Sequence, residues 1–340
     1  MTHELKTIIE EYLLAKSKGL KSVLATVVHL EGSSYRKPGV RMLITQKGKL
    51  TGAVSGGCVE KEVLRQAQTV FVNDTPKMMT YDGRYRLGCE GILYILLEPL
   101  NFSDEFLTAF RRNLKARNTF KIDSLFTPTE GSHKHLGSTI YYQDGTHYSF
   151  YNTQIQIEQE TDLDIFSQTL KPAFKLILIG AEHDAVALCQ SAAFLGWEVT
   201  VVAPPKDAKQ KSNFPGVQEV VNSSPEMFDY TNIDDQTAIV LMTHNYALDL
   251  NFLVHLAKTR PAYVGLLGPK KRREKLLHEF LEYYPEVEPE FLEILHGPAG
   301  LNIGSITAQE IAISILSEIL SVIRAQNPML LKEKVGAIHS

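Results

Sequence analysis

Residues 174–203, FKLILIGAEHDAVALCQSAAFLGWEVTVVA, decide the fold of the second half of the chain. An uninterrupted apolar run at 174–180 ends at a glycine and is typical of a strand buried on both faces. Residues 184–197 have the apolar spacing of a helix, and 198–203 is a second apolar strand. A strand, a helix and a strand in close succession predict a βαβ unit, whose two strands lie parallel in one sheet.

The same alternation continues toward the end of the chain. Further strands are expected at 217–221, 237–242 and 262–268, and further helices at 247–258, 270–281 and 307–325. The start of the last helix is well marked, because Thr307 and Glu310 have the spacing of a capping box. We therefore predict a C-terminal Rossmann-like domain at 173–330, with a parallel sheet covered by helices on both faces.

The first half has a mixed pattern of helices and shorter strands. Helices are expected before Gly19, at 59–71 and at 103–116, and strands at 22–30, 42–45, 50–54, 77–81 and 92–100. Alternating apolar and polar side chains at 139–157 predict an antiparallel sheet. Residues 158–172 are acidic and polar without a strand pattern, and we interpret them as a linker. The sequence thus predicts an N-terminal mixed α/β domain at 1–165.

The composition excludes several classes of protein. The chain has 35 Lys and Arg against 39 Asp and Glu in 340 residues, a net charge of −4, so no nucleic-acid-binding surface is expected. No run of eighteen apolar residues suggests a membrane span, and no cleavage site typical of a secretory signal follows the N-terminus. Three cysteines cannot form a paired disulfide framework, so we expect a reducing compartment, the cytoplasm.

The turn after the first Rossmann strand is where such folds bind the phosphates of a dinucleotide. The fingerprint is G-x-G-x-x-G or A, and this chain has Gly180, Glu182 and Ala185 at the three places. The Glu182 carboxylate adds bulk and negative charge where a pyrophosphate must approach the backbone. The second strand ends in Ala203, without an Asp or Glu for the ribose hydroxyls. We therefore expect a Rossmann-like scaffold that does not bind NAD(P) in the usual way.

Two of the three cysteines lie in glycine-containing loops. Cys58 follows Gly56 and Gly57 at the expected start of a helix, where the helix dipole lowers the pKa of a thiol. Cys89 lies in the loop RLGCEG, whose glycines leave room for a large ligand. A thiolate is a soft ligand that suits a sulfur-rich metal centre, whereas no C-x-x-C or paired His motif indicates zinc. Cys189 lies in an apolar helix and is expected in the core.

A tight loop at 32–41, GSSYRKPGVR, concentrates polar and basic side chains. Such a set suits a phosphate or an oxygen-rich ring, because it offers charge-assisted hydrogen bonds. From charge alone, a solvated turn explains the same residues. The candidate binding residues in this loop are Ser33, Ser34, Tyr35, Arg36 and Arg41.

The carboxyl ends of parallel strands form the usual ligand-binding edge of an open α/β sheet. We expect the segments 243–246, 265–273 and 296–304 to cluster there. The basic residues 270–273 begin a helix, against its dipole, which favours an anion beside them; an exposed basic stripe is an equal alternative. The candidate residues at this edge are Gly180, His183, His244 and Asn245.

Taken in order, these segments resemble the XdhC/CoxI family of accessory proteins for molybdenum hydroxylases such as xanthine dehydrogenase. The resemblance covers most of the chain, with residues 101–170 contributing little. The family usually has glycine where this chain has Glu90 and Glu182, and aspartate where it has Ala203. The matching motifs are GSSYRKPGVRMLIT, LTGAVSGGCVEKEVL, LGCEGILYILLEP, LILIGAEHDAVAL, LGWEVTVVAP, VLMTHNYALDL, YVGLLGPKKRRE and LHGPAGLNIGSITAQEIAISILSEI.

This resemblance implies a maturation chaperone rather than an enzyme. Such a protein would bind the molybdenum cofactor (molybdopterin), support its sulfuration and deliver it to the apo form of a molybdenum hydroxylase. A cysteine desulfurase becomes the candidate sulfur donor. The resemblance also implies an α/β cofactor-binding domain, a Rossmann-like domain and a homodimer. Cys58 and Cys89 would be the metal ligands at the cofactor site.

Two other functions stay open at the level of sequence. One is an NAD(P)-dependent oxidoreductase on the Rossmann-like domain, against which Glu182 and Ala203 argue. The other is a non-catalytic scaffold for a hydroxylase, which would not need cysteines in its loops. The last helix carries more apolar residues than one face needs, and this predicts that the chain associates with itself.

Overall fold

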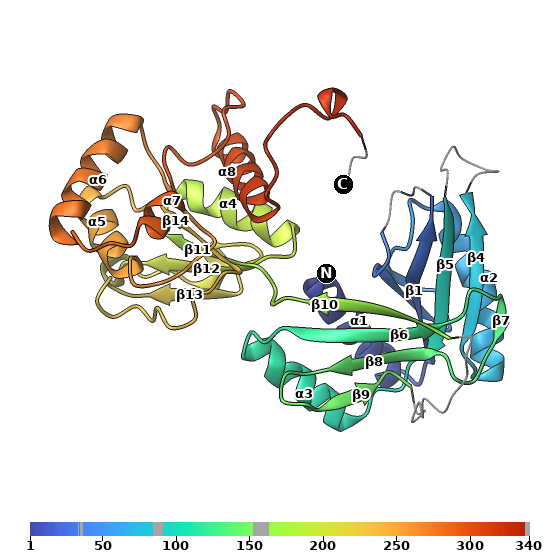
Figure 1. Ribbon diagram of the computed structural model, residues 1–340. Helices are drawn as coiled ribbons and strands as arrows, with labels where there is room; N and C mark the ends of the chain where they lie inside the picture. The colour runs from blue at the N-terminus through green and yellow to red at the C-terminus, as the bar shows by residue number, and fades with distance from the viewer. Residues whose placement is uncertain (33, 35–36, 84–90, 152–162, 337–340) are drawn as a thin grey trace. The chain divides into compact units, whose positions relative to one another are not determined.

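The computed structural model consists of two compact units, unit 1 (Met1–Pro172) and unit 2 (Ala173–Ser340), and each is described by itself (Figure 1). The structure describes residues 1–32, 34, 37–83, 91–151 and 163–336.

A six-stranded antiparallel sheet is the centre of unit 1. One face packs against α2 (Cys58–Asn73), which contacts Val23 and Ala25, and the other packs against α1 (Thr2–Ser17), which contacts Leu24. This alternation follows from the strand period of two. The strand order is β3-β2-β1-β5-β4-β7, with β1 Ser22–Glu31, β2 Arg41–Thr45, β3 Leu50–Gly52, β4 Lys77–Asp82, β5 Ile92–Pro99 and β7 Gly131–Ser132.

A smaller antiparallel sheet completes unit 1. Helix α3 (Asp104–Lys115) covers it with Phe106 and Phe110, whose rings lie among other aromatic side chains such as Phe120. The strand order is β10-β6-β8-β9, with β6 Phe120–Phe126, β8 Gly137–Tyr141, β9 His147–Ser149 and β10 Asp164–Leu170.

The interpretation of residues 158–172 as a linker is wrong for β10. This strand pairs with β6 over its whole length, from Asp164 opposite Phe126 to Leu170 opposite Phe120. It lies at the edge of the smaller sheet with most side chains at least partly exposed, so no apolar pattern reveals it. The backbone ladder to β6 makes it a strand, and side-chain patterning does not encode that ladder.

Unit 2 is built on a six-stranded parallel sheet. Helices α4 (His183–Phe194) and α8 (Ala308–Ile323) pack on one face, and α5 (Tyr246–Leu256), α6 (Lys270–Tyr283) and α7 (Pro289–Glu293) pack on the other. The strand order is β13-β12-β11-β14-β15-β16, with β11 Lys175–Ile179, β12 Glu198–Ala203, β13 Glu219–Asn222, β14 Thr237–Leu241, β15 Tyr263–Leu266 and β16 Leu295–His296. This is the Rossmann order. The predicted fold class, a mixed α/β domain followed by a Rossmann-like parallel-sheet domain, is confirmed.

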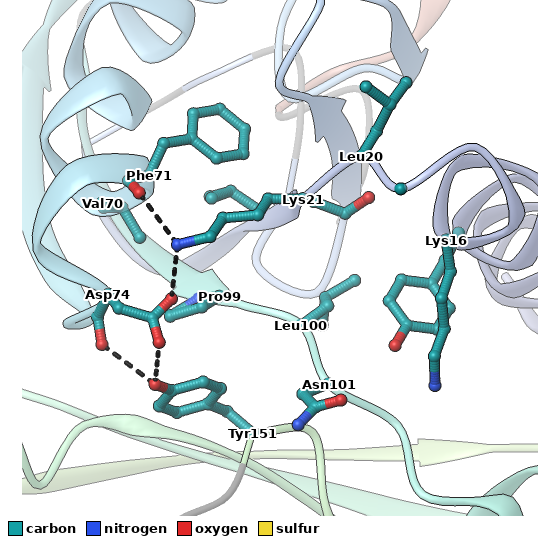
Figure 2. A pocket seen from close by; sticks show the side chains of 14 residues that line it. Lys16, Leu20, Lys21, Val70, Phe71, Asp74, Pro99, Leu100, Asn101 and Tyr151 are labelled. Atoms are coloured by element: carbon teal, nitrogen blue, oxygen red, sulfur yellow. Dashed lines mark hydrogen bonds and ion pairs between the residues drawn. The ribbon is translucent and has the colours of Figure 1, made fainter.

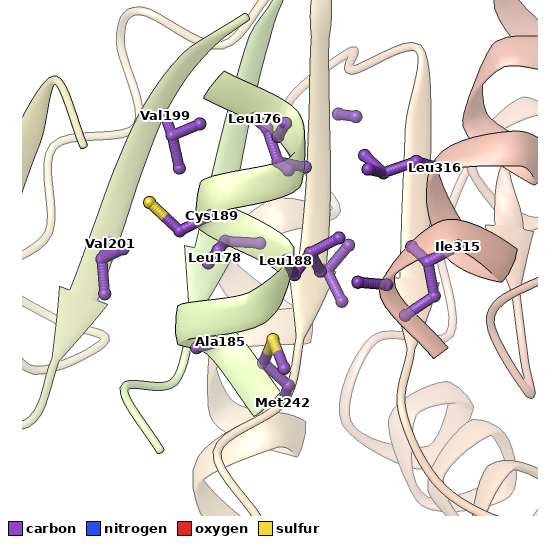
Figure 3. Packing of buried hydrophobic residues seen from close by; sticks show 14 of the residues in the cluster. Leu176, Leu178, Ala185, Leu188, Cys189, Val199, Val201, Met242, Ile315 and Leu316 are labelled. Carbon is purple, nitrogen blue, oxygen red and sulfur yellow. The ribbon is translucent and has the colours of Figure 1, made fainter. Parts of the chain in front are cut away.

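Aliphatic side chains form the core between this sheet, α4 and α8 (Figure 3). Leu188 and Cys189 of α4 lie in the same cluster as Val199 of β12 and Leu316 of α8. Cys189 is completely buried, and burial raises the pKa of its thiol to about 11. The prediction that Cys189 is a core residue is therefore confirmed.

Helix α8 begins as expected. The Thr307 hydroxyl accepts a hydrogen bond from the Glu310 backbone at 3.3 Å, and the Glu310 carboxylate accepts one from the Thr307 backbone at 2.9 Å. This reciprocal pair confirms the predicted capping box. Among the helices of the described residues, none has the length and apolar character needed to cross a membrane.

Candidate functional site

Three motif-bearing loops leave the large sheet of unit 1 at the same end. β1 ends at Glu31, which lies opposite Ile92 at the start of β5, and β4 ends at Asp82 opposite the same residue. β3 ends at Gly52, opposite Met42 near the start of β2. The described ends of the segments that carry GSSYRKPGVR, SGGC and RLGCEG therefore lie at one end of the sheet.

Several predicted site residues of unit 1 lie outside the described residues. Of the remaining members, Ser34 is half-buried, and Gly56 and Gly57 are exposed. The part of the chain that the structure describes contains no group of three or more His, Cys, Asp or Glu able to hold a metal. The metal and cofactor roles stay predictions. The residues outside the description are Ser33, Tyr35, Arg36, Cys89 and the side chain of Cys58.

The start of α2 is held by a serine and a glutamate. Gly57, the N-cap, has φ +123°, a left-handed conformation that suits glycine, and it has no side chain with which to cap the helix. The Glu60 carboxylate instead accepts bonds from the Ser55 backbone at 2.8 Å and the Ser55 hydroxyl at 2.7 Å. Burial raises the pKa of Glu60, but these bonds outweigh it and keep the pKa below its usual value. Glu60, at the third position of the helix, is the residue in the sequence that could have indicated these hydrogen bonds at the start of α2.

Arg41, a predicted cofactor ligand, lies inside unit 1. Its side chain donates to the Gly39 carbonyl at 3.1 Å and to the Gln168 amide oxygen at 2.5 Å. Its Nε and Nη2 atoms have no partner among the described residues. Burial lowers the pKa of Arg41 to about 10, against the opposing effect of the Glu98 carboxylate. The structure therefore places this guanidinium in the interior, behind the loop that precedes it.

Glu98 is a buried carboxylate that the sequence did not single out. It accepts bonds from the Ser138 backbone at 2.8 Å and the Ser138 hydroxyl at 2.6 Å. Burial raises its pKa to about 7, although Ser138 and Arg41 act in the opposite direction. The apolar strand ILYILLEPL hides this residue, because only the covering sheet shows that position 98 faces the interior.

A pocket of about 310 Å³ lies at the opposite end of the large sheet (Figure 2). Lys21 reaches across it to the Phe71 carbonyl at 3.4 Å and to the Asp74 carboxylate at 3.7 Å. The Tyr151 hydroxyl donates to the same carboxylate at 2.5 Å. Lys21 and Asp74 thus bind each other, Lys16 donates to the Phe102 carbonyl at 3.4 Å, and the pocket lies away from the motif-bearing loops.

In unit 2, Gly180 lets two strand ends come close together. Its φ is +132°, and a Cβ atom there would lie 2.3 Å from the Met242 carbonyl oxygen. β11 and β14 are neighbouring parallel strands that end side by side at this point. The chain continues from β11 to β12 and β13 on one side of the sheet and to β14, β15 and β16 on the other, so the strand order reverses here. Such a switch point is the usual ligand crevice of an open α/β sheet. His183 is exposed at the first position of α4 beside it.

His244 and Asp184 meet across this crevice. The His244 Nε2 atom lies 3.5 Å from an Asp184 carboxylate oxygen, and both side chains reach solvent. His244 has φ +55°, a left-handed conformation that costs energy for a residue other than glycine. The structure therefore brings together His244, a predicted site residue from the end of β14, and Asp184 from the start of α4, which the sequence did not single out.

The next group is organised by Asp249, a buried carboxylate of α5. It accepts bonds from the Thr243 hydroxyl at 2.7 Å and from the Arg272 guanidinium at 2.5 Å. Burial raises the pKa of Asp249, while Thr243 and Arg272 partly oppose that effect. The anion beside the Arg272 guanidinium is therefore the Asp249 carboxylate of the same chain. Asn245 caps α5 by accepting a bond from the Leu248 backbone at 3.1 Å, a structural role.

The other basic residues at the start of α6 differ from Arg272. Lys270 and Lys271 are exposed, and Lys270 lies 3.7 Å from Glu274 of the same helix. Arg273 packs against Gly297, where a Cβ atom would lie 2.8 Å from its Cδ, and its buried Nε has no partner among the described residues. The predicted basic cluster is thus partly exposed and partly built into the fold.

A further network, missed by sequence reasoning, holds the loop after β16. The Glu318 carboxylate of α8 accepts bonds from the Tyr263 hydroxyl at 2.5 Å and the Gly300 backbone at 2.8 Å. His296 Nδ1 lies 3.4 Å from the other Glu318 oxygen. Burial raises the pKa of Glu318, but these partners outweigh it and lower the pKa overall. Glu318, an acid within an apolar stretch of α8, is the feature of the sequence that could have indicated this network.

Glu182 and Ala203, the two residues that argue against dinucleotide binding, lie at the places that the Rossmann fingerprint assigns to them. Glu182 is the exposed N-cap of α4, and its side chain makes no capping bond. Ala203 ends β12 and is completely buried. A carboxylate therefore lies in the turn where a dinucleotide would bind with its phosphates, and β12 ends in alanine instead of the Asp or Glu that would bind the ribose.

Comparison with known proteins gives two matching family models. The model described as the XdhC Rossmann domain matches residues 176–319, and the model described as the XdhC and CoxI family matches residues 15–82. The two matches fall in unit 2 and unit 1, respectively. The motifs of both halves of the chain are thus recognised independently.

Individual relatives match over nearly the whole chain. A Bacillus subtilis protein named as a probable subunit of xanthine dehydrogenase is 29% identical, over 88% of this chain and 92% of its own. The Escherichia coli molybdenum cofactor insertion chaperone PaoD is 24% identical, over 95% and 90%. A crystal structure described as a xanthine dehydrogenase from Bacillus halodurans has a TM-score of 0.75 and 26% identity, and the match covers 94% of this chain and 96% of that one. By its motifs, its fold and these matches, the chain belongs to the XdhC and CoxI family.

Proposed function

We propose that this protein is an accessory protein that binds the molybdenum cofactor and delivers it to a molybdenum hydroxylase such as xanthine dehydrogenase. The observation that carries the proposal is the similarity, over 95% of the chain, to a molybdenum cofactor insertion chaperone. The similarity to a protein named as a probable subunit of xanthine dehydrogenase supports the same class of partner.

In this proposal the motif-bearing end of unit 1 is the cofactor site. Cys58 is the first candidate to contact molybdenum or its terminal sulfur, with Cys89 as a second contributor, because thiolates suit a sulfur-rich metal centre. Ser34 and the glycines before Cys58 provide polar contacts and space for the ring. In unit 2, His183 and His244, at the end of the parallel sheet where β11 and β14 end, are separate candidates for binding an anion.

Sulfuration of the cofactor, with a cysteine desulfurase as the donor, and action in a reducing compartment such as the cytoplasm are further parts of the proposal. So is a homodimer. Its support is that Ile303, Ile306 and Ile313, in and before α8, are 54%, 86% and 52% exposed. Light scattering at micromolar concentration tests the dimer, and a monomer there would contradict it.

The central test measures molybdenum in the purified full-length chain after expression in cells that make the cofactor. We expect molybdenum to copurify with the protein and the loaded protein to activate an apo-hydroxylase. Cys58→Ser keeps the size of the side chain but loses the soft ligand, so we expect it to lose most of the metal. Cys189→Ala, which removes the core thiol, is the matched control and should retain it. Absence of molybdenum from the wild-type protein would contradict the proposed function. Retention of molybdenum at the wild-type level by both Cys58→Ser and Cys89→Ser would contradict the assignment of the cysteines.

An oxidoreductase that uses NAD(P) is not favoured, because Glu182 stands at the phosphate turn and Ala203 replaces the ribose-binding acid. Calorimetry with NAD and NADP is expected to show no binding at micromolar concentration. Tight binding of either nucleotide would restore this alternative.

A further inference from the structure

A bulge in β1 changes which way its last residues point. Val27 lies opposite Ile95, but His29 lies opposite Tyr94, so Val28 is an extra residue in the ladder. Regular alternation would turn His29 toward the same face as Val27, which packs against α2. The bulge instead turns it to the face of Tyr94. Bulges often redirect a side chain beside a functional site.

The redirected histidine joins an aromatic group. Its ring lies edge-on to Tyr94, with centroids 5.2 Å apart, and nearly parallel to the buried ring of Phe126 at 6.3 Å. His29 itself is exposed and Tyr94 is half-buried. The rings of His29 and Tyr94, which pack against each other, therefore offer a partly exposed surface on which a planar ligand can stack.

A carboxylate stands beside these rings. Glu31 is exposed, and one of its oxygens accepts a hydrogen bond from the Tyr94 hydroxyl at 2.7 Å. This bond raises the pKa of Tyr94, which keeps its proton on the donor side. Within the described part of the chain, Tyr94 is the group that bonds Glu31, so the second carboxylate oxygen can accept further hydrogen bonds. Glu31 is also the last residue of β1, at the end of the sheet where the motif-bearing loops begin.

A stacking surface with a carboxylate at its rim fits one type of heterocycle. The 2-amino-4-oxopyrimidine ring carries two parallel N–H donors, one on the ring and one on the amino group. A carboxylate accepts both in a charge-assisted pair. Replacing the amino group by an oxygen turns one donor into an acceptor and sets it against the carboxylate.

We propose that His29, Tyr94 and Glu31 form a binding site for a 2-amino-4-oxopyrimidine ring, the unit that pterins and guanine share. The site deepens the proposed function and rests on it for the expectation that a pterin is the source of that ring. His29 and Tyr94 stack on the ring, and Glu31 pairs with its two donors.

The test measures binding of free heterocycles to the full-length protein by calorimetry. The probes are 6-hydroxymethylpterin, the corresponding lumazine that lacks the amino group, guanosine and adenosine. We expect the pterin to bind at least about tenfold more tightly than the lumazine and more tightly than adenosine. Guanosine binding equal to that of the pterin would assign the site to the ring alone, and weaker binding would assign it to pterins; either result supports the shared chemistry.

Variants separate stacking from pairing. Glu31→Gln should abolish the preference for pterin over lumazine, whereas His29→Ala should weaken both about tenfold, the scale of a lost stacking contact. The matched control is His147→Ala, because exposed His147 also stacks on a tyrosine, Tyr141, at 5.6 Å, but there beside Lys121 instead of a carboxylate. It should change nothing. Thermal unfolding checks that the variants are folded.

Equal binding of pterin and lumazine, retained discrimination in Glu31→Gln, or no pterin binding would overturn the site. The proposed function is judged separately by copurified molybdenum. Protein that carries molybdenum without dependence on His29 and Glu31 would overturn this inference alone. Discrimination between pterin and lumazine in a protein that never loads molybdenum would overturn the proposed function and leave this site standing.

Discussion

The buried carboxylates of the two units lie in different relations to the candidate sites. In unit 2, Asp249 accepts hydrogen bonds from the backbone and hydroxyl of Thr243, just after β14, at the edge where His244 and Asp184 meet. In unit 1, Glu98 lies opposite Leu24, near the start of β1, whereas the motif-bearing loops begin at the other end of that sheet. A parallel sheet gathers its strand ends and their polar partners at one edge. In the antiparallel sheet of unit 1, Glu98 lies toward the end opposite the motif-bearing loops, whereas the buried Arg41 and Glu60 belong to or adjoin those loops.

The largest effect on stability is expected from Gly180→Ala, which adds a methyl group between the ends of β11 and β14 in unit 2. The added Cβ would lie 2.3 Å from the Met242 carbonyl oxygen, and the left-handed φ also disfavours alanine. We expect a loss of about 3–4 kcal/mol in the free energy of unfolding, measured in urea. Gly304→Ala is the control, because Gly304 has φ +75° but open space around it. Equal losses in both variants would show that close approach of the strands contributes nothing.

The next effect concerns the interior of unit 1 and its dependence on pH. The pKa of Glu98 is raised from 4.5 to about 7, so between these values the folded state binds more protons than the unfolded chain. Stability is then greatest at and below pH 4.5 with respect to this group, and falls as the pH rises toward 7, by roughly 3 kcal/mol. Glu98→Gln should remove this slope in unfolding curves recorded across that range. A slope unchanged from the wild type would assign the pH dependence to other groups.

A smaller effect is expected from Asp249→Asn in unit 2. The amide keeps a bond from Thr243 but leaves the Arg272 guanidinium without its carboxylate, so we expect a loss of about 2 kcal/mol. The control is Asp207→Asn, since Asp207 pairs with Lys209 at the surface and should contribute less than about 1 kcal/mol. If both variants behave alike in urea unfolding, the Asp249–Arg272 pair does not stabilise the carboxyl edge.

The two halves of the chain also differed in how far sequence reasoning reached. The apolar strands of unit 2, such as Lys175–Ile179, are long enough and buried enough to be recognised, and their order of elements predicts the edge at which His244 meets Asp184. The same reasoning missed β10, whose exposed side chains have no apolar pattern. It also missed Glu98 and Glu318, because a single acid in an apolar segment does not show which partners will surround it.

The fold class, the Rossmann-like architecture of unit 2, the capping box of α8 and the family could all be predicted from the sequence. These depend on local periodicity and on long motifs, which are read along the chain. Three features became visible only in the folded chain: Arg41 lies inside unit 1, Asp249 supplies the anion for Arg272, and a bulge turns His29 toward Tyr94 and Glu31. Those outcomes depend on strand register and on contacts between residues far apart in the chain. A one-residue shift in register moves a side chain to the other face of a sheet, and nothing in the local sequence records that shift.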